Sequence, residues 1–470
     1  MYIKQLYTGC LSEAAYYIEN EGEAAVIDPL RDIDVYLQLA DERKTHIKYI
    51  FETHFHADFI SGHLELSKAT GAPIVYGPQT KAGFDVLVAS DGDVFKLGNI
   101  SIQILHTPGH TPESTCFLLK NEEGKDYAVF TGDTLFCGDV GRPDLAQASG
   151  LVTTEELAAQ LFDSLQNKII PLADDVLVYP AHGPGSSCGK NLGPKTHSTI
   201  GEEKSTNYAL QPKTADEFVK TVTEGLSAPP QYFSINAEMN KKGYENLDTI
   251  LEKGLTPLPV EAFKNKAKEN DATILDTRSG DVFTIGFVPG SINIGLEGRF
   301  AEWAGSLLSF TNVLLLVTDE GMEKDTIIRL ARVGFENIQG YLQGGFEAWK
   351  KSGEPVDLII NVEADEVAMD IPFDENMVIV DVRKEIEFGN GHVKEAVNIP
   401  LENMIDPVTI AGINDTDNVY LHCAGGYRSV IAASLLKHHG IHNLRNISGG
   451  YKALKSEVKI KTEKSTEVLN

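Results

Sequence analysis

Thr53-His54-Phe55-His56-Ala57-Asp58-Phe59 follows an apolar run, residues 47–51, that predicts a β-strand. Two histidines and a carboxylate this close together are costly to bury unless each side chain finds a partner. A metal ion can partner several of them at once, and a loop at the end of a strand is a common place for site residues. The stretch therefore predicts a metal-binding loop at the end of a strand.

Three later stretches of the chain also place a histidine or an aspartate just after a strand-like run. His110 stands in His106-Thr107-Pro108-Gly109-His110-Thr111, Asp133 in Phe130-Thr131-Gly132-Asp133-Thr134, and His182 in Tyr179-Pro180-Ala181-His182-Gly183. Each follows an apolar, strand-like run and lies beside Gly or Pro. Together with the first stretch, these loops favour a metal centre over four unrelated polar turns.

The order and setting of the four motifs resemble the metallo-β-lactamase superfamily, over roughly the first half of the chain. The resemblance implies an α/β fold that begins with an αβ/βα metallo-β-lactamase sandwich. Members with two metal ions carry a further histidine directly after the Asp of the first motif, where this chain has Phe59. A phenyl ring cannot bind a metal ion, so this position points to one metal rather than two.

The second half of the chain contains an internal repeat. Asp276-Thr277-Arg278 recurs as Asp381-Val382-Arg383, and Gly344-Gly345-Phe346 recurs as Gly449-Gly450-Tyr451. Strand-like runs alternate with helical stretches in both copies, which predicts two small α/β domains with mainly parallel sheets. Both copies resemble the rhodanese domain.

As a whole, the chain resembles a fusion of a persulfide dioxygenase with two C-terminal rhodanese domains. The predicted domains are a metallo-β-lactamase-like persulfide dioxygenase domain at 1–255, a degenerate rhodanese domain without cysteine at 256–355, an active rhodanese domain at 356–460 and a flexible tail at 461–470. The resemblance implies an enzyme that oxidises a low-molecular-weight persulfide with O₂ to sulfite, thiosulfate or both. It also implies rhodanese sulfurtransferase activity, in sulfide or persulfide detoxification.

The resemblance further implies one Fe(II) per chain, with positions left open for O₂ chemistry. Its ligands are expected to be His54, His110 and Asp133. The residues expected around them, where they orient ligands or contact water and substrate, are His56, Asp58 and His182. Zinc prefers similar donors. The alternative is therefore a zinc-dependent thioester hydrolase of the glyoxalase II type, fused to rhodanese domains, in which His56 and His182 bind the metal.

The second rhodanese-like repeat carries the loop Cys423-Ala424-Gly425-Gly426-Tyr427-Arg428-Ser429 between a strand-like run and an apolar helix. Its glycines let backbone N–H groups turn inward, and the helix N-terminus and Arg428 both favour an anion. A thiolate or a persulfide is such an anion. We expect Cys423 to carry sulfane sulfur and Arg428 to help hold the anionic donor or acceptor. The corresponding place in the first repeat, Val317 or Thr318, has no cysteine, which predicts a catalytically inactive domain.

Two further residues are candidates for substrate-binding or accessory roles. Arg142 follows the Asp133 loop closely and could pair with a substrate carboxylate, or it could be a solvated loop arginine. Cys188 follows His182 closely and lies beside Gly189. Its thiol could be reactive and near the metal, or it could serve packing.

Composition limits the classes of partner. The 470 residues carry a formal net charge of −27, which argues against nucleic acid or an anionic membrane surface. The five cysteines form no Cys-x-x-Cys pair, which fits a reducing compartment. Without an apolar run of membrane-spanning length, the predicted location is the cytoplasm. The expected partners are a small-molecule persulfide, O₂, thiosulfate and sulfite, and the resemblance implies a homo-oligomer.

Overall fold

The computed structural model describes residues 1–145, 152–190, 192–226, 228–414 and 416–465. The chain divides into two compact units. The first unit is Met1–Leu247 together with the short segment Leu330–Phe335, and the second is Asp248–Arg329 together with Glu336–Asn470. Among the described residues, every helix is too short or too polar to cross a bilayer.

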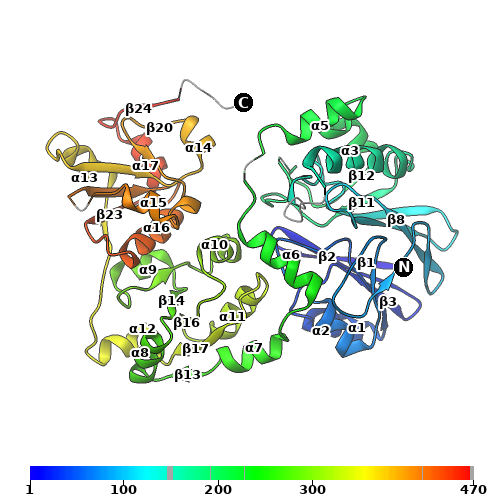
Figure 1. Ribbon diagram of the computed structural model, residues 1–470, viewed down its shortest axis with the longest axis horizontal. Coiled ribbons are helices and arrows are strands. Elements are labelled where there is room, and N and C mark those ends of the chain that lie inside the picture. The colour runs from blue at the N-terminus through cyan, green and yellow to red at the C-terminus, as the bar shows by residue number, and fades with distance from the viewer. Residues whose placement is uncertain (146–151, 191, 227, 415, 466–470) are drawn as a thin grey trace. The chain divides into compact units, whose positions relative to one another are not determined.

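Two six-stranded sheets form the centre of the first unit (Figure 1). The strands of one sheet are, in spatial order, β1 (Tyr2–Thr8), β2 (Glu13–Asn20), β3 (Glu23–Ile27), β4 (His46–Phe51), β5 (Ile74–Tyr76) and β6 (Leu87–Val88). The strands of the other are β12 (Ser198–Thr199), β11 (Leu177–Pro180), β10 (Asp126–Gly132), β9 (Thr115–Lys120), β8 (Ile100–His106) and β7 (Val94–Leu97). In the first sheet β1 to β3 run antiparallel, and β3 to β6 run parallel.

Alternation along the strands divides the apolar side chains between layers. On β2, Tyr16 and Ile18 join a core shared by the two sheets, whereas Tyr17 joins a core with helices α1 (Asp34–Arg43) and α2 (His63–Thr70). This follows from the two-residue period of a strand, which sends successive side chains to opposite faces. The predicted αβ/βα sandwich is thereby confirmed in its helix-bearing first sheet and its shared core.

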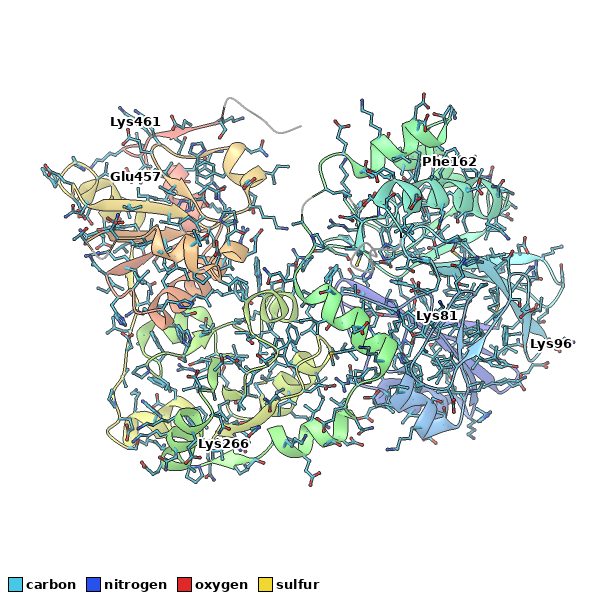
Figure 2. The ribbon with its side chains drawn as sticks, viewed as in Figure 1. Lys81, Lys96, Phe162, Lys266, Glu457 and Lys461 are labelled. Atoms are coloured by element: carbon cyan, nitrogen blue, oxygen red, sulfur yellow. The ribbon has the colours of Figure 1, made fainter. Side chains whose placement is uncertain are left out.

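The second sheet has its own helical layer. Helices α3 (Thr154–Ser164) and α5 (Ala215–Thr223) cover its apolar face. The ring centroid of Phe162 on α3, labelled in Figure 2, lies 5.5 Å from that of Phe218 on α5. Thr153 caps α3 by accepting a hydrogen bond from the backbone N–H of Glu156. The other helices among the described residues of this unit are η2 (Leu165–Ile169), α4 (Ile200–Thr206), η3 (Tyr208–Leu210) and α6 (Tyr232–Lys242).

The second unit contains two five-stranded sheets with the same relative strand order. The first repeat has, in spatial order, β13 (Pro257–Leu258), β17 (Ile338–Leu342), β16 (Leu314–Val317), β14 (Thr273–Asp276) and β15 (Ile292–Asn293). The second repeat has β18 (Ile360–Val362), β23 (Leu444–Ile447), β22 (Asn418–His422), β19 (Met377–Asp381) and β21 (Val397–Asn398). Neighbouring strands in both sheets are parallel, which confirms the two α/β domains.

Helices accompany both of these sheets. Those of the first repeat are α7 (Leu247–Gly254), α8 (Val260–Glu269), α9 (Gly280–Ile285), α10 (Phe300–Leu307), α11 (Glu323–Ala331) and α12 (Gly345–Lys351). Those of the second repeat are α13 (Ala364–Asp370), α14 (Glu385–Gly389), η4 (Leu401–Asn403), α15 (Pro407–Ala411), α16 (Tyr427–His438) and α17 (Gly450–Ser456). Each repeat has its own apolar cluster.

The repeated Asp-x-Arg motif has the same structural role in both domains. Arg278 Nε donates to Asp276 at 2.9 Å, and Arg383 Nε donates to Asp381 at the same distance. Each arginine also donates to a backbone carbonyl eight residues further on, which ties the strand end to the following loop. A buried carboxylate paired in this way escapes the cost of an isolated charge.

The predicted tail is partly structured. Thr462–Glu463 (β24) pairs antiparallel with His392–Val393 (β20), so this part of 461–470 belongs to the fold of the second repeat. Residues 466–470 lie outside the described residues. The other domain boundaries stay predictions.

Candidate metal centre and cysteine site

Three predicted ligands meet in the first unit. His54 lies just beyond β4, His110 just beyond β8, and Asp133 directly after β10. All three side chains are buried, and their ligand atoms lie within 4.8 Å of one another. Asp133 Oδ2 is 3.4 Å from Nε2 of His110 and 3.9 Å from Nε2 of His54. Strand ends of both sheets thus bring two imidazoles and a carboxylate together.

The orientation of His110 is set by its other ring nitrogen. Its Nδ1 lies 2.8 Å from the backbone carbonyl oxygen of Arg142, and a carbonyl can only accept, so Nδ1–H donates. Nε2 therefore faces Asp133, whose carboxylate oxygens have no hydrogen-bond partner among the described residues. A buried carboxylate without a hydrogen-bond partner is costly unless a cation lies beside it.

His54 is oriented through a neighbouring hydroxyl. Thr53 donates its hydroxyl to the Asp28 carboxylate at 2.9 Å, which leaves Thr53 Oγ1 to accept from Nδ1–H of His54 at 2.9 Å. Burial, together with nearby imidazoles, holds the pKa of His54 well below its ordinary value and keeps the ring neutral. A neutral ring with Nε2 free is what a metal ligand requires, so the donor set fits a metal ion.

Asp58 and His182, predicted beside the metal, form a second cluster with Cys188. His182 Nε2 lies 3.5 Å from Asp58 Oδ2 and 3.5 Å from Asp133 Oδ1. Burial, together with the charges of Asp58 and Asp133, raises the pKa of the Cys188 thiol well above its ordinary value. The structure therefore places the candidate accessory cysteine next to the predicted metal ligands.

His56, in contrast, faces away from this group. Its Nε2 lies 3.1 Å from Asp28 and 3.5 Å from Glu52, and the ring of Phe59 lies 4.3 Å from its own. Burial alone would lower the pKa of His56, but the two carboxylates raise it well above its ordinary value. The Nε2 atom of His56 would have to leave both carboxylates before it could bind a metal ion.

Several buried polar residues near the site were missed from the sequence. Asp28 supports both Thr53 and His56, and Glu52 lies 3.3 Å from His63 Nδ1. Glu13 is fully buried, and its carboxylate has no hydrogen-bond partner among the described residues. Burial raises the pKa of Glu13 well above its ordinary value. Asp28 could have been found, because it ends an apolar strand just before a proline. Glu13 carries no such signal.

Two glycines allow the ligand loops to approach closely. Gly132 has φ +50°, and an added Cβ would lie 2.7 Å from the Thr53 side chain. A Cβ on Gly141 would lie 1.9 Å from the carbonyl oxygen of Asp133 and 3.0 Å from Nδ1 of His110. Any side chain at these positions would displace the candidate ligands or Thr53, which contacts one of them.

Arg142 contributes its backbone rather than a solvated charge. Its side chain is buried and pairs with Asp144 through two hydrogen bonds of 2.7 Å, while its carbonyl oxygen accepts from His110. A substrate carboxylate would have to compete with Asp144. The predicted contact of Arg142 with substrate stays a prediction.

Cys423 lies where the sequence placed it, between β22 and α16. It is buried, and its Sγ accepts a hydrogen bond of 3.1 Å from the backbone N–H of Gly426, which has φ +117°. Arg428 is held by Glu387, with two hydrogen bonds of 2.7 and 2.8 Å. The loop therefore donates a backbone N–H to the sulfur. Arg428 is already paired with Glu387, so an anion held by Arg428 would have to share the guanidinium group with the Glu387 carboxylate.

The first repeat supports this cysteine loop. The hydroxyl of Tyr427, inside the loop, donates to the backbone carbonyl of Gly295 at 2.9 Å, and Ser434 of α16 accepts from the N–H of Asn293 at 2.9 Å. In the first repeat, Thr318 follows β16 where Cys423 follows β22. The absence of a cysteine at this position agrees with a supporting role.

Comparisons with known proteins agree with this architecture. The metallo-beta-lactamase superfamily model matches residues 8–182, and the rhodanese-like domain model matches residues 259–352 and 363–457. A crystal structure of a metallo-beta-lactamase from Staphylococcus aureus subsp. aureus COL superposes with a TM-score of 0.64 at 32% identity, covering 73% of this chain and 99% of that one.

Curated relatives fall into two activity classes. The human mitochondrial persulfide dioxygenase ETHE1 is 33% identical over 221 residues, which cover 46% of this chain and 78% of the relative. Hydroxyacylglutathione hydrolase from Francisella tularensis subsp. novicida is 34% identical over 185 residues, or 39% of this chain and 68% of the relative. The chain belongs to the metallo-β-lactamase superfamily, and two rhodanese-like domains follow the metallo-β-lactamase fold.

Proposed function

We propose that the first unit is an Fe(II)-dependent persulfide dioxygenase and that the second unit transfers sulfane sulfur at Cys423. The observation that carries the proposal is the donor set of His54, His110 and Asp133, with His56 turned away to Asp28. Two imidazoles and one carboxylate, with further positions open, form the arrangement typical of non-haem iron oxygenases. The relationship to a persulfide dioxygenase and the attached rhodanese-like domains support the same reaction.

The proposed reaction converts a persulfide RSSH, O₂ and water into the thiol RSH, sulfite and two protons. Both atoms of O₂ and one oxygen of water end on the terminal sulfur, whose bond to the other sulfur breaks. An Fe(II) ion at the three ligands would supply the open positions and the redox chemistry that O₂ requires. The chain itself keeps His54 neutral, aims both Nε2 atoms inward, and buries the site away from bulk water.

Cys423 is proposed to exchange sulfane sulfur with small anions. Attack of its thiolate on thiosulfate forms the Cys423 persulfide and releases sulfite, while the reverse step makes thiosulfate from sulfite. The N–H of Gly426 donates to the sulfur and stabilises negative charge on it. In either direction the cysteine handles sulfite or sulfane sulfur, which are the product and substrate classes proposed for the metal centre.

Metal content and O₂ uptake test this proposal directly. Protein purified anaerobically should contain about one iron per chain and consume O₂ only when a small-thiol persulfide is present. The His110→Ala variant should lose both iron and O₂ uptake, while Cys423→Ser should lose only thiosulfate:acceptor sulfurtransferase activity. Persulfide-independent or absent O₂ uptake in the iron-loaded protein would contradict the proposal.

A thioester hydrolase of the glyoxalase II type is the second candidate. It is favoured by the relationship to hydroxyacylglutathione hydrolases at comparable identity. Phe59 and the orientation of His56 weigh against it, because both remove a donor that a zinc pair would use. Release of thiol from an acylated glutathione by the zinc-loaded protein, without O₂ uptake by the iron-loaded protein, would select this alternative.

A further inference from the structure

A short segment of the first rhodanese-like repeat packs with the first unit. Leu330–Phe335 lies inside the rhodanese-like residues 259–352, at the end of α11, yet its contacts place it in the first unit. Ala331 and Val333 within the segment are fully buried. The repeat that lacks the cysteine therefore supplies a packed segment to the unit that contains the candidate metal centre.

This segment holds the far end of the loop that carries the first metal ligand. The backbone carbonyl oxygen of Arg332 accepts a hydrogen bond of 2.6 Å from the N–H of Ile60. Ile60 directly follows the stretch from Thr53 to Phe59, and it is fully buried, so water cannot replace this bond. The end of the ligand loop is thus fixed by a residue that is distant in the chain.

The side chain of Arg332 holds a second loop. Its Nε and Nη2 donate to the two carboxylate oxygens of Asp32, each at 2.7 Å. The preceding residue, Arg31, is fully buried and donates to the backbone carbonyl oxygen of Ala331 at 3.1 Å. A forked pair of this kind fixes the direction of both partners as well as their distance. The segment is therefore attached firmly to residues 31 and 32.

The loop that ends with these residues begins with Asp28, which supports a candidate ligand. Asp28 accepts hydrogen bonds from the backbone N–H and the hydroxyl of Thr53, at 2.8 and 2.9 Å. The same hydroxyl oxygen lies 2.9 Å from Nδ1 of His54. Arg332 thus contacts two loops, one that supports His54 through Asp28 and one that contains His54 and ends at Ile60.

We propose that Arg332 is a positioning residue for the metal centre, because it joins these two loops on either side of His54. The cysteine-free repeat then has a task at the metal centre, although it lacks the residue that sulfur transfer needs. The inference rests on the proposed metal site but not on the reaction proposed there, so its test is made on metal binding and on the metal-free chain.

Amide hydrogen exchange of the metal-free, full-length chain tests the position of the loop directly. Arg332→Gln removes the charged pair with Asp32, and we expect peptides that cover residues 53–60 to exchange faster by about tenfold or more. Peptides that cover β9 should keep their rate. The dissociation constant for Co²⁺, measured by competition with a chelator, should rise about 10–100-fold in the same variant, because a support of a ligand is lost.

Two further variants separate positioning from general stability. Arg329→Gln is the matched control, because Arg329 lies on the same helix but donates to the carbonyl oxygen of Leu296 and pairs with Asp325, both outside the first unit. It should leave exchange at 53–60 and the Co²⁺ dissociation constant unchanged. Adding Asp32→Asn to Arg332→Gln should cause little further loss of affinity, since the two residues act through one contact.

Unchanged exchange at 53–60 together with an unchanged Co²⁺ dissociation constant in Arg332→Gln would overturn the proposal. Equal changes in Arg329→Gln would also overturn it, because they would reflect a general loss of stability. If thermal unfolding shows that Arg332→Gln does not fold, Arg332→Lys takes its place, since it keeps the charge without the fork and should show smaller changes in the same direction. O₂ uptake by the iron-loaded wild-type protein tests the dioxygenase separately, so each proposal can fail without the other.

Discussion

Removing the hydroxyl of Thr53 should weaken metal binding without disturbing the fold. Thr53→Val keeps the shape of a side chain that is almost fully buried against Gly132. It removes the hydrogen bond to the Asp28 carboxylate and the acceptor for Nδ1–H of His54, each 2.9 Å long. The backbone N–H of Thr53 still donates to Asp28 at 2.8 Å, so the loop keeps its anchor.

The magnitude follows from the bond to the charged Asp28 carboxylate, which fixes the hydroxyl that accepts from His54. A hydrogen bond to a charged group contributes about 1.5–3 kcal/mol, and each 1.4 kcal/mol changes an equilibrium constant about tenfold. Loss of a partner that orients a metal-binding histidine typically weakens metal affinity about 10–100-fold. Both routes give the same range. We therefore expect the dissociation constant for Fe(II) to rise about 10–100-fold in Thr53→Val.

Competition against a chelator of known affinity measures this constant anaerobically. Thr107→Val is the matched control, because Thr107 is equally buried and its hydroxyl bonds to Thr134 and Cys116 rather than to a proposed ligand. Thermal unfolding of the metal-free variants checks that both have folded. An equal loss of affinity in Thr53→Val and Thr107→Val would refute the orienting role of the hydroxyl.

Three further results are expected. Tyr427→Phe should lower the sulfurtransferase kcat several-fold and leave O₂ uptake unchanged, because the cysteine loop loses its hydrogen bond to the first repeat. A sulfurtransferase kcat equal to that of the wild-type protein in steady-state assays would contradict this. Gly141→Ala should abolish iron retention, measured by elemental analysis, because the new Cβ would lie 1.9 Å from the carbonyl oxygen of Asp133. Partial burial raises the pKa of Glu387, but Arg428 lowers it below its ordinary value overall. The stabilising pair is therefore present above the unfolded pKa and lost as pH falls through the folded one, so Glu387→Gln should lose less stability on acidification in thermal melts.

The sequence was a good guide wherever local pattern decides. The candidate ligands His54, His110 and Asp133 follow strand ends, and the structure brings them together. The Cys423 loop was also predicted from the sequence, because a cysteine opens a glycine-rich turn that leads into a helix N-terminus. Motifs of this kind depend on short-range geometry, which neighbouring residues largely fix.

The neighbours of those residues were harder to predict. His56 and Asp58 lie two positions apart, yet one turns to Asp28 and Glu52 and the other to His182. Nothing in the local pattern separates these choices, because Asp28 and His182 come from loops distant in the chain. The fully buried Glu13 was missed for the same reason.

The sequence by itself determined the superfamily and the repeat, because their motifs depend on residue type and local spacing, and it offered His54, His110, Asp133 and Cys423 as candidate site residues. Only the tertiary structure decided that Cys188 joins Asp58 and His182, and that Glu387 holds Arg428. These contacts form between segments far apart in the chain. They depend on how sheets and loops pack, and packing is set by the whole buried core rather than by any short stretch.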